Sequence, residues 1–198
     1  MRKIVFLFTL FLASTLFAND NNDGKRVIVL DPGHGGVDTG VKSEEFQEKE
    51  IVLKIAKLIK ERNKFQDTEF IILRTEDEQM SNENRAKLIS NFNPDLVLSL
   101  HVHSNVKSSV KGLEAHISPM NNCFDDSKQY AEKINNKLMD LGFENIGIKE
   151  NNTKILRDPL APTVMLHIGH LTNQEDKAIV TNENNYILIA DKILEALE

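Results

Sequence analysis

The chain has 198 residues, of which 40% are hydrophobic and 27% are charged. This length fits one ordinary domain, and the composition is too apolar for a disordered chain and too polar for a polytopic membrane protein. The 24 Lys and Arg residues are outnumbered by 30 Asp and Glu residues, and they form no basic cluster. A nucleic-acid partner is therefore not expected, because phosphates select clustered Lys and Arg.

Residues 1–18 have the three parts of a secretory signal peptide. Arg2 and Lys3 give a positive start, residues 4–13 form an apolar run, and residues 14–18 (STLFA) lead into a polar stretch at 19–24. The run is too short to span a bilayer comfortably, although a retained N-terminal anchor is the alternative. We therefore expect cleavage after Ala18 and an exported protein, periplasmic or extracellular, without stable membrane insertion. A short linker over 19–25 and a single domain over 26–198 would follow.

Strands and helices are expected to alternate along this domain. Apolar and β-branched runs predict strands over 26–30, 69–73, 95–100, 113–117 and 163–168. Apolar residues at helical spacing predict four helices. The first begins at Glu48 and has about four turns, and the others extend from Ser81 to Asn91, over 131–141 and over 186–197. This order predicts a three-layer α/β/α domain with a central, mostly parallel twisted sheet.

The predicted strand ends carry five of the six histidines. His34 follows the first strand in a glycine-rich loop, and the remaining four close two buried strands: His101, His103, His167 and His170. The carboxyl ends of parallel strands share one edge of a sheet, where ligands usually bind. Glu48 begins the next helix and can turn toward that edge. Imidazoles and a carboxylate without thiolates suit a catalytic zinc site, with three protein ligands and one open position.

Four segments in order closely resemble the motifs of zinc-dependent N-acetylmuramoyl-L-alanine amidases, also called amidase type 3. They are residues 27–40 (VIVLDPGHGGVDTG), 48–53 (EKEIVL), 99–105 (SLHVHSN) and 162–173 (PTVMLHIGHLTN). The resemblance covers the chain from Arg26 to the last helix. It implies hydrolysis of the amide between N-acetylmuramic acid and L-alanine in peptidoglycan or muropeptides, with one Zn²⁺ per chain.

The resemblance also implies roles for individual residues. His34, Glu48 and His101 match the zinc ligands, with Glu50 as the alternative to Glu48. Arg74 and Arg85 match arginines for which we expect a structural role. His103, Asn105 and His170 stand at polar or aromatic positions of the motifs, where we expect substrate contacts.

One position departs from the family pattern, because His167 stands where the family has its catalytic glutamate. Three roles remain open for it. His167 could act as the general base, since imidazole titrates near 6.5. It could be a fourth zinc ligand that closes the site. It could also mark a weak or inactive zinc protein that binds peptidoglycan or regulates its cleavage. A partner protein that activates the enzyme is a further expectation of unknown identity.

Two other residues are expected to be passive. Cys123 is the only cysteine, so an intramolecular disulfide is impossible and the side chain has no activating neighbours. His116 lies inside a predicted strand, where a structural or exposed histidine is the simpler interpretation.

Overall fold

The computed structural model describes residues 24–198, so the predicted signal peptide and most of the predicted linker lie outside the described residues. The strands are β1 (Arg26–Pro32), β2 (Lys42–Ser43), β3 (Phe46–Gln47), β4 (Thr68–Ile72), β5 (Leu96–His103), β6 (Leu113–Ile117), β7 (Asn145–Glu150) and β8 (Thr163–His170). The helices are α1 (Glu48–Glu61), α2 (Asn82–Asn91), α3 (Phe124–Leu138), α4 (Lys154–Arg157), α5 (Gln174–Val180) and α6 (Glu183–Leu197), with a 3-10 turn at Met139–Leu141.

Six strands form the central sheet in the order β4-β1-β5-β8-β6-β7. All neighbouring pairs are parallel except β6 and β8, which run antiparallel. The mostly parallel α/β sheet predicted from the sequence is therefore confirmed. The strands β1, β5 and β8, which carry the histidine motifs, are adjacent in the middle of the sheet.

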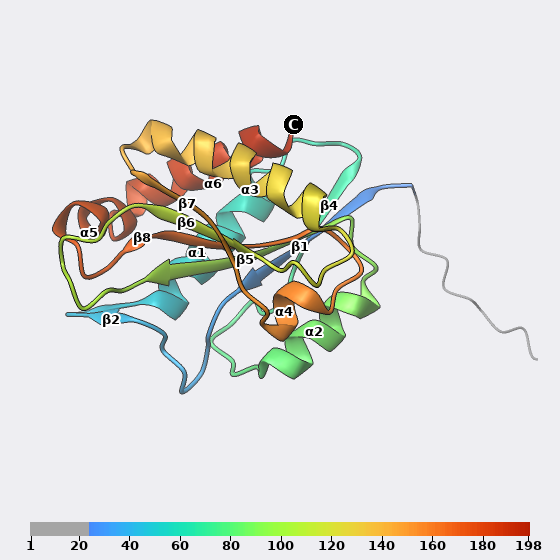
Figure 1. Cartoon of the computed structure of the whole chain (residues 1–198), viewed down its shortest axis with the longest axis horizontal. Helices are drawn as coiled ribbons and strands as arrows, with labels where there is room; N and C mark the ends of the chain where they lie inside the picture. The colour runs from blue at the N-terminus through green and yellow to red at the C-terminus, as the bar shows by residue number, and fades with distance from the viewer. Residues whose placement is uncertain (1–23) are drawn as a thin grey trace, which may run out of the picture.

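Helices cover the two faces of the sheet unequally. In Figure 1, α3 and α6 lie above the sheet, and α2 and the short α4 lie below it. Residues of α1, α3 and α6 share one large apolar core with buried residues of five strands, which are β1, β4, β5, β6 and β8. The second cluster is much smaller and contains Val29, Leu73, Ile89, Val97 and Ile155. Part of this second face is therefore left for polar side chains.

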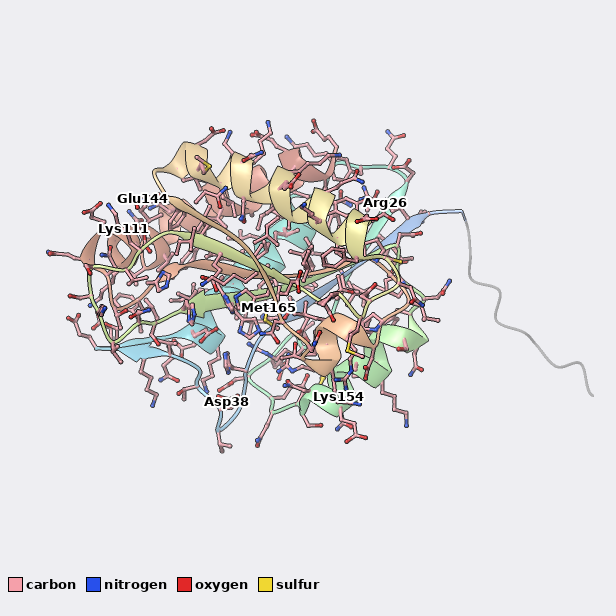
Figure 2. All side chains as sticks on the ribbon, viewed as in Figure 1. Arg26, Asp38, Lys111, Glu144, Lys154 and Met165 are labelled. Carbon is pink, nitrogen blue, oxygen red and sulfur yellow. The ribbon has the colours of Figure 1, made fainter. Side chains whose placement is uncertain are left out.

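The alternation of side chains along the strands decides which residues those are. In β5, Leu96, Leu98 and Leu100 belong to the large core, so His101 continues the row of Val97 and Ser99 on the opposite face. In β8, Leu166 and Ile168 belong to the large core, which leaves Met165 and His167 on the same opposite face. Figure 2 shows Met165 between the sheet and α4. The histidines thus lie on the thinly covered face as well as at the strand ends.

Some of the predicted strand and helix boundaries were confirmed, and some predicted strands were too short. The strand at 113–117 has its predicted bounds, and Ser81 is the N-cap of α2, where its side chain accepts a hydrogen bond from the Asn84 N–H. The strands predicted at 95–100 and 163–168 end three and two residues before β5 and β8 do, because the histidines near their ends are not typical strand residues. The hairpin β2–β3, strand β7 and helices α4 and α5 had no sequence prediction. Among residues 24–198, no helix is long and apolar enough to cross a membrane.

Candidate metal centre

His34, Glu48 and His101 come together at the carboxyl ends of β1 and β5. The Oε1 atom of Glu48 lies 3.1 Å from His34 Nε2 and 2.9 Å from His101 Nδ1. One ligand atom from each of the three residues lies within 4.8 Å of the others. Glu50 is exposed on the same helix, so the structure brings Glu48 and not its alternative into this cluster.

Backbone geometry keeps the space between these side chains clear. A Cβ atom on Gly33 would lie 2.2 Å from Cε1 of His101, and one on Gly40 would lie 2.4 Å from Oε2 of Glu48. The buried Glu48 carboxylate is held by two backbone donors, because Val41 N–H reaches Oε2 at 2.9 Å and Val102 N–H reaches Oε1 at 2.9 Å. The carboxylate is thereby fixed before any ion binds.

Two buried arginines hold the loop that carries His34. Arg74 donates to the carbonyl oxygens of Pro32 (2.9 Å), Gly33 (2.7 Å) and Lys49 (2.9 Å), and so joins the loop to the first turn of α1. Arg85 donates to the carbonyl oxygens of Pro32 and His34, and it pairs with the buried carboxylate of Asp31. The structural role predicted for both arginines agrees with these contacts.

The charges of the cluster support one another. Burial alone would raise the pKa of Glu48, but hydrogen bonds from His101 and His34 outweigh it and hold the pKa of this carboxyl well below its ordinary value. Burial would lower the pKa of His34, and the neighbouring carboxylates of Glu48 and Asp38 raise it instead. Asp38 Oδ2 lies 2.9 Å from His34 Nδ1, at the tip of the loop after β1 (Figure 2). A carboxylate on the second ring nitrogen orients an imidazole ligand and makes it a better donor.

The donor chemistry of the cluster fits zinc. Two imidazoles and one carboxylate are a set that catalytic zinc uses, and donors about 2.0–2.2 Å from a tetrahedral ion lie roughly 3.3–3.6 Å apart. The observed separations of 3.1 and 2.9 Å from the Glu48 oxygen are a few tenths of an ångström shorter than that spacing. A small cation could enter with modest side-chain movement.

His167 lies beside this cluster. It is the cross-strand partner of His101, with ring centroids 5.5 Å apart, and His116 packs against it edge-on at 4.5 Å. Burial, together with the neighbouring imidazoles of His101, His116 and His103, lowers the pKa of His167 to about 3. The ring is therefore neutral at physiological pH, and its Nδ1 atom is buried without a hydrogen-bond partner among the described residues.

The three residues predicted to contact substrate occupy different depths. His103 is half-buried and stacks on His170 at a centroid distance of 5.0 Å. His170 is only 1% exposed, so it offers almost no surface to a substrate. Asn105 lies farther out, where its N–H donates to Thr172 Oγ1 at 2.9 Å beside a shallow surface hollow. Substrate contact by these residues stays a prediction.

Sequence reasoning missed Glu114. This buried residue of β6 is the cross-strand partner of His167, and its carboxylate is bonded to His116 and Lys149. The signal was present in the run LEAHI, where Leu113, Ala115 and Ile117 alternate with two titratable residues. A strand that buries its apolar residues on one face must turn Glu114 and His116 to the other, where the histidine motifs lie.

Comparison with known proteins agrees with this geometry. The family model described as N-acetylmuramoyl-L-alanine amidase matches residues 28–198. The probable cell wall amidase LytH of Staphylococcus aureus is 27% identical over 177 residues, covering 87% of this chain and 57% of the relative. The chain thus spans little more than half the length of that curated relative.

Two solved amidase structures share the fold over nearly their whole length. An N-acetylmuramoyl-L-alanine amidase from Clostridium difficile 630 superposes with a TM-score of 0.82 at 28% identity, covering 87% of this chain and 95% of that one. The CwlD amidase of Clostridioides difficile, solved in complex with the GerS lipoprotein, shares the fold with a TM-score of 0.80 at 24% identity, covering 87% and 96%. The match of the family model over nearly all of the described residues shows that the chain belongs to the N-acetylmuramoyl-L-alanine amidase family.

Proposed function

We propose that the chain is a zinc-dependent hydrolase that cleaves the amide between N-acetylmuramic acid and L-alanine in peptidoglycan or muropeptides. Family membership supports the reaction class, and the observation that supports the metal is the convergence of His34, Glu48 and His101 on one point. These three residues would hold one zinc ion. When bound, zinc would act as a Lewis acid that polarises the scissile carbonyl and lowers the pKa of water.

The residues of the chain would supply positioning and proton transfer. His167, neutral at physiological pH, would accept the proton of the attacking water and pass it to the amide nitrogen as the carbon–nitrogen bond breaks. The products would be the free lactyl carboxylate and a peptide with a new amino terminus at L-alanine. His103 and Asn105 would contact the substrate, and the ring of His170 would hold the ring of His103 in place by stacking on it.

The low basicity of His167 favours a second candidate function. An imidazole with a pKa of about 3 is a weaker proton acceptor than the carboxylate that the family places there. The chain could then hold zinc and bind peptidoglycan while cutting it slowly or not at all, as a binding or regulatory protein. Activity of the zinc-loaded chain separates the two functions.

The proposal also covers where the protein acts and which kind of partner it has. We propose export to the periplasm or the cell exterior, from the signal-like residues 1–18 and from the relative named as a cell wall amidase. Because CwlD has been solved with a lipoprotein, we also propose that a partner protein regulates this chain.

The metal assignment is tested with a matched pair of variants on one helix. Glu48→Gln should lose the zinc ion held with His34 and His101, and with it hydrolysis, because the buried carboxylate is a proposed ligand. Glu50→Gln removes the same charge from an exposed position two residues away and should keep both. Zinc content is measured by elemental mass spectrometry, and hydrolysis by the release of alanine amino termini from peptidoglycan. Equal zinc content in the two variants would contradict the assignment.

A further inference from the structure

A second cluster of metal-binding side chains lies next to the first. His103, Glu114 and His167 each place a ligand atom within 4.8 Å of the others, as His34, Glu48 and His101 do. Both groups consist of two imidazoles and one carboxylate. The proposed hydrolysis uses only the first group as a metal centre and leaves the carboxylate of Glu114 without a role.

The sheet itself brings the second cluster together. His101 on β5, His167 on β8 and Glu114 on β6 are successive cross-strand partners, so they form one row across three adjacent strands. In an antiparallel pair such as Glu114 and His167, directly opposite side chains lie about 4.5–5.5 Å apart at Cβ. A register shift between His101 and His103 brings His103 opposite His170, and its ring centroid lies 4.7 Å from that of His167. The cluster thus rests on strands, which hold side chains more rigidly than loops.

His167 and Glu114 have lone pairs that are not used in other contacts and can coordinate an ion. The Nδ1 atom of His167 is buried and has no hydrogen-bond partner among residues 24–198. A cation coordinated through that nitrogen would supply the missing partner. Glu114 already bonds His116 through Oε1 and Lys149 through Oε2, the latter at 2.5 Å. A carboxylate offers about four lone-pair positions, so two remain for a metal.

We propose that His103, Glu114 and His167 form a second site for a divalent transition-metal cation, directly beside the site of His34, Glu48 and His101. The ion pair with Lys149 makes this the weaker of the two, since a fixed positive charge opposes a cation. The side chain of Lys149 is 56% exposed and can swing into solvent when the ion enters. His116 then serves to orient the Glu114 carboxylate, as hydrogen-bonded neighbours of metal ligands generally do.

Filling the second site has a consequence for the proposed reaction. His167 donates a lone pair to the second cation and no longer accepts a proton through that nitrogen. The proposed hydrolysis therefore belongs to the chain with one zinc ion, and zinc beyond one equivalent slows it. The site itself does not depend on that reaction, because metal binding is measured without substrate.

The test is a zinc titration of the purified chain, without a histidine tag, after removal of metal by a chelator. Equilibrium dialysis with elemental mass spectrometry should find two zinc ions per folded wild-type chain at saturation. Glu114→Gln should bind one, and His34→Ala should also bind one, because each loses a different site. Saturation of the wild type at one zinc ion, or two ions retained by Glu114→Gln, overturns the proposal.

A second variant covers the case in which Glu114→Gln does not fold, which circular dichroism shows. Lys149→Gln keeps every proposed ligand and removes only the competing charge. It should bind two zinc ions, with the second about two- to fivefold tighter than in the wild type, the range of a partly exposed ion pair. An unchanged second dissociation constant in Lys149→Gln contradicts the proposed position of the ion.

Discussion

Gly33→Ala should separate metal binding from folding, because it adds one methyl group at the back of a proposed ligand. The new Cβ would lie 2.2 Å from Cε1 of His101 and 2.7 Å from both of its ring nitrogens. Ordinary carbon contacts are about 3.5–4.0 Å, so the ring must move by more than about 1 Å. The φ angle of Gly33 is outside the left-handed region, so alanine adds no backbone strain of that kind.

The size of the effect follows from the tolerance of a metal site. Metal–ligand distances stay within about 0.2 Å of their usual values, so a displacement of the ring by more than about 1 Å removes His101 as a ligand. Loss of a residue that merely orients a ligand costs about 10–100-fold in affinity, so we expect a loss of at least about 100-fold, or about 2.8 kcal/mol.

The assay is a zinc titration against a competing chelator, with thermal unfolding of the metal-free chain as the measure of folding. Gly147→Ala is the control, because no atom lies within 4 Å of its added Cβ although its φ is positive. It should keep its zinc affinity. Wild-type zinc affinity in Gly33→Ala would refute the placement of His101 in the metal centre.

Three further predictions concern activity and stability. His167→Glu restores the carboxylate of the family motif and should raise hydrolysis at least about tenfold, since a general base contributes roughly 10²–10⁴-fold; an unchanged rate would count against proton transfer at this position. Arg85→Leu leaves Asp31 buried and unpaired, and urea unfolding should show a loss of about 3–5 kcal/mol, while a loss below about 1 kcal/mol would contradict the pairing. When the free zinc concentration is about 100 times the dissociation constant, removing zinc should lower the free energy of unfolding by about 2.7 kcal/mol. The Tm should then fall by about 5–10 °C, which scanning calorimetry measures. An unchanged Tm would mean that zinc does not bind the folded chain.

The large core and the first candidate metal site could be anticipated from local sequence patterns. The runs at 26–30, 95–100 and 163–168 bury Leu30, Leu98 and Leu166 in the large core, and such continuous apolar runs predict central strands. Adjacent parallel strands then bring their carboxyl ends together. That rule, together with the position of Glu48 at the start of the next helix, predicts that His34 and His101 lie near Glu48.

The second cluster needed information that the sequence does not carry locally. That β6 pairs antiparallel with β8, and that Glu114 faces His167, depends on strand order and register, which distant contacts decide. Strand β7 contains Gly147 and several polar residues because it is an edge strand with little burial. Helix α4 has four residues, too few for a helical period to be recognised.

The hydrolysis itself is tested most directly by digestion of purified peptidoglycan with the zinc-loaded chain lacking residues 1–18, followed by mass spectrometry of the products. We expect free stem peptides that begin at L-alanine, and their absence when the zinc is removed by a chelator. Intact glycopeptides at full occupancy of the first zinc site would contradict the proposed hydrolysis and support the binding or regulatory function instead.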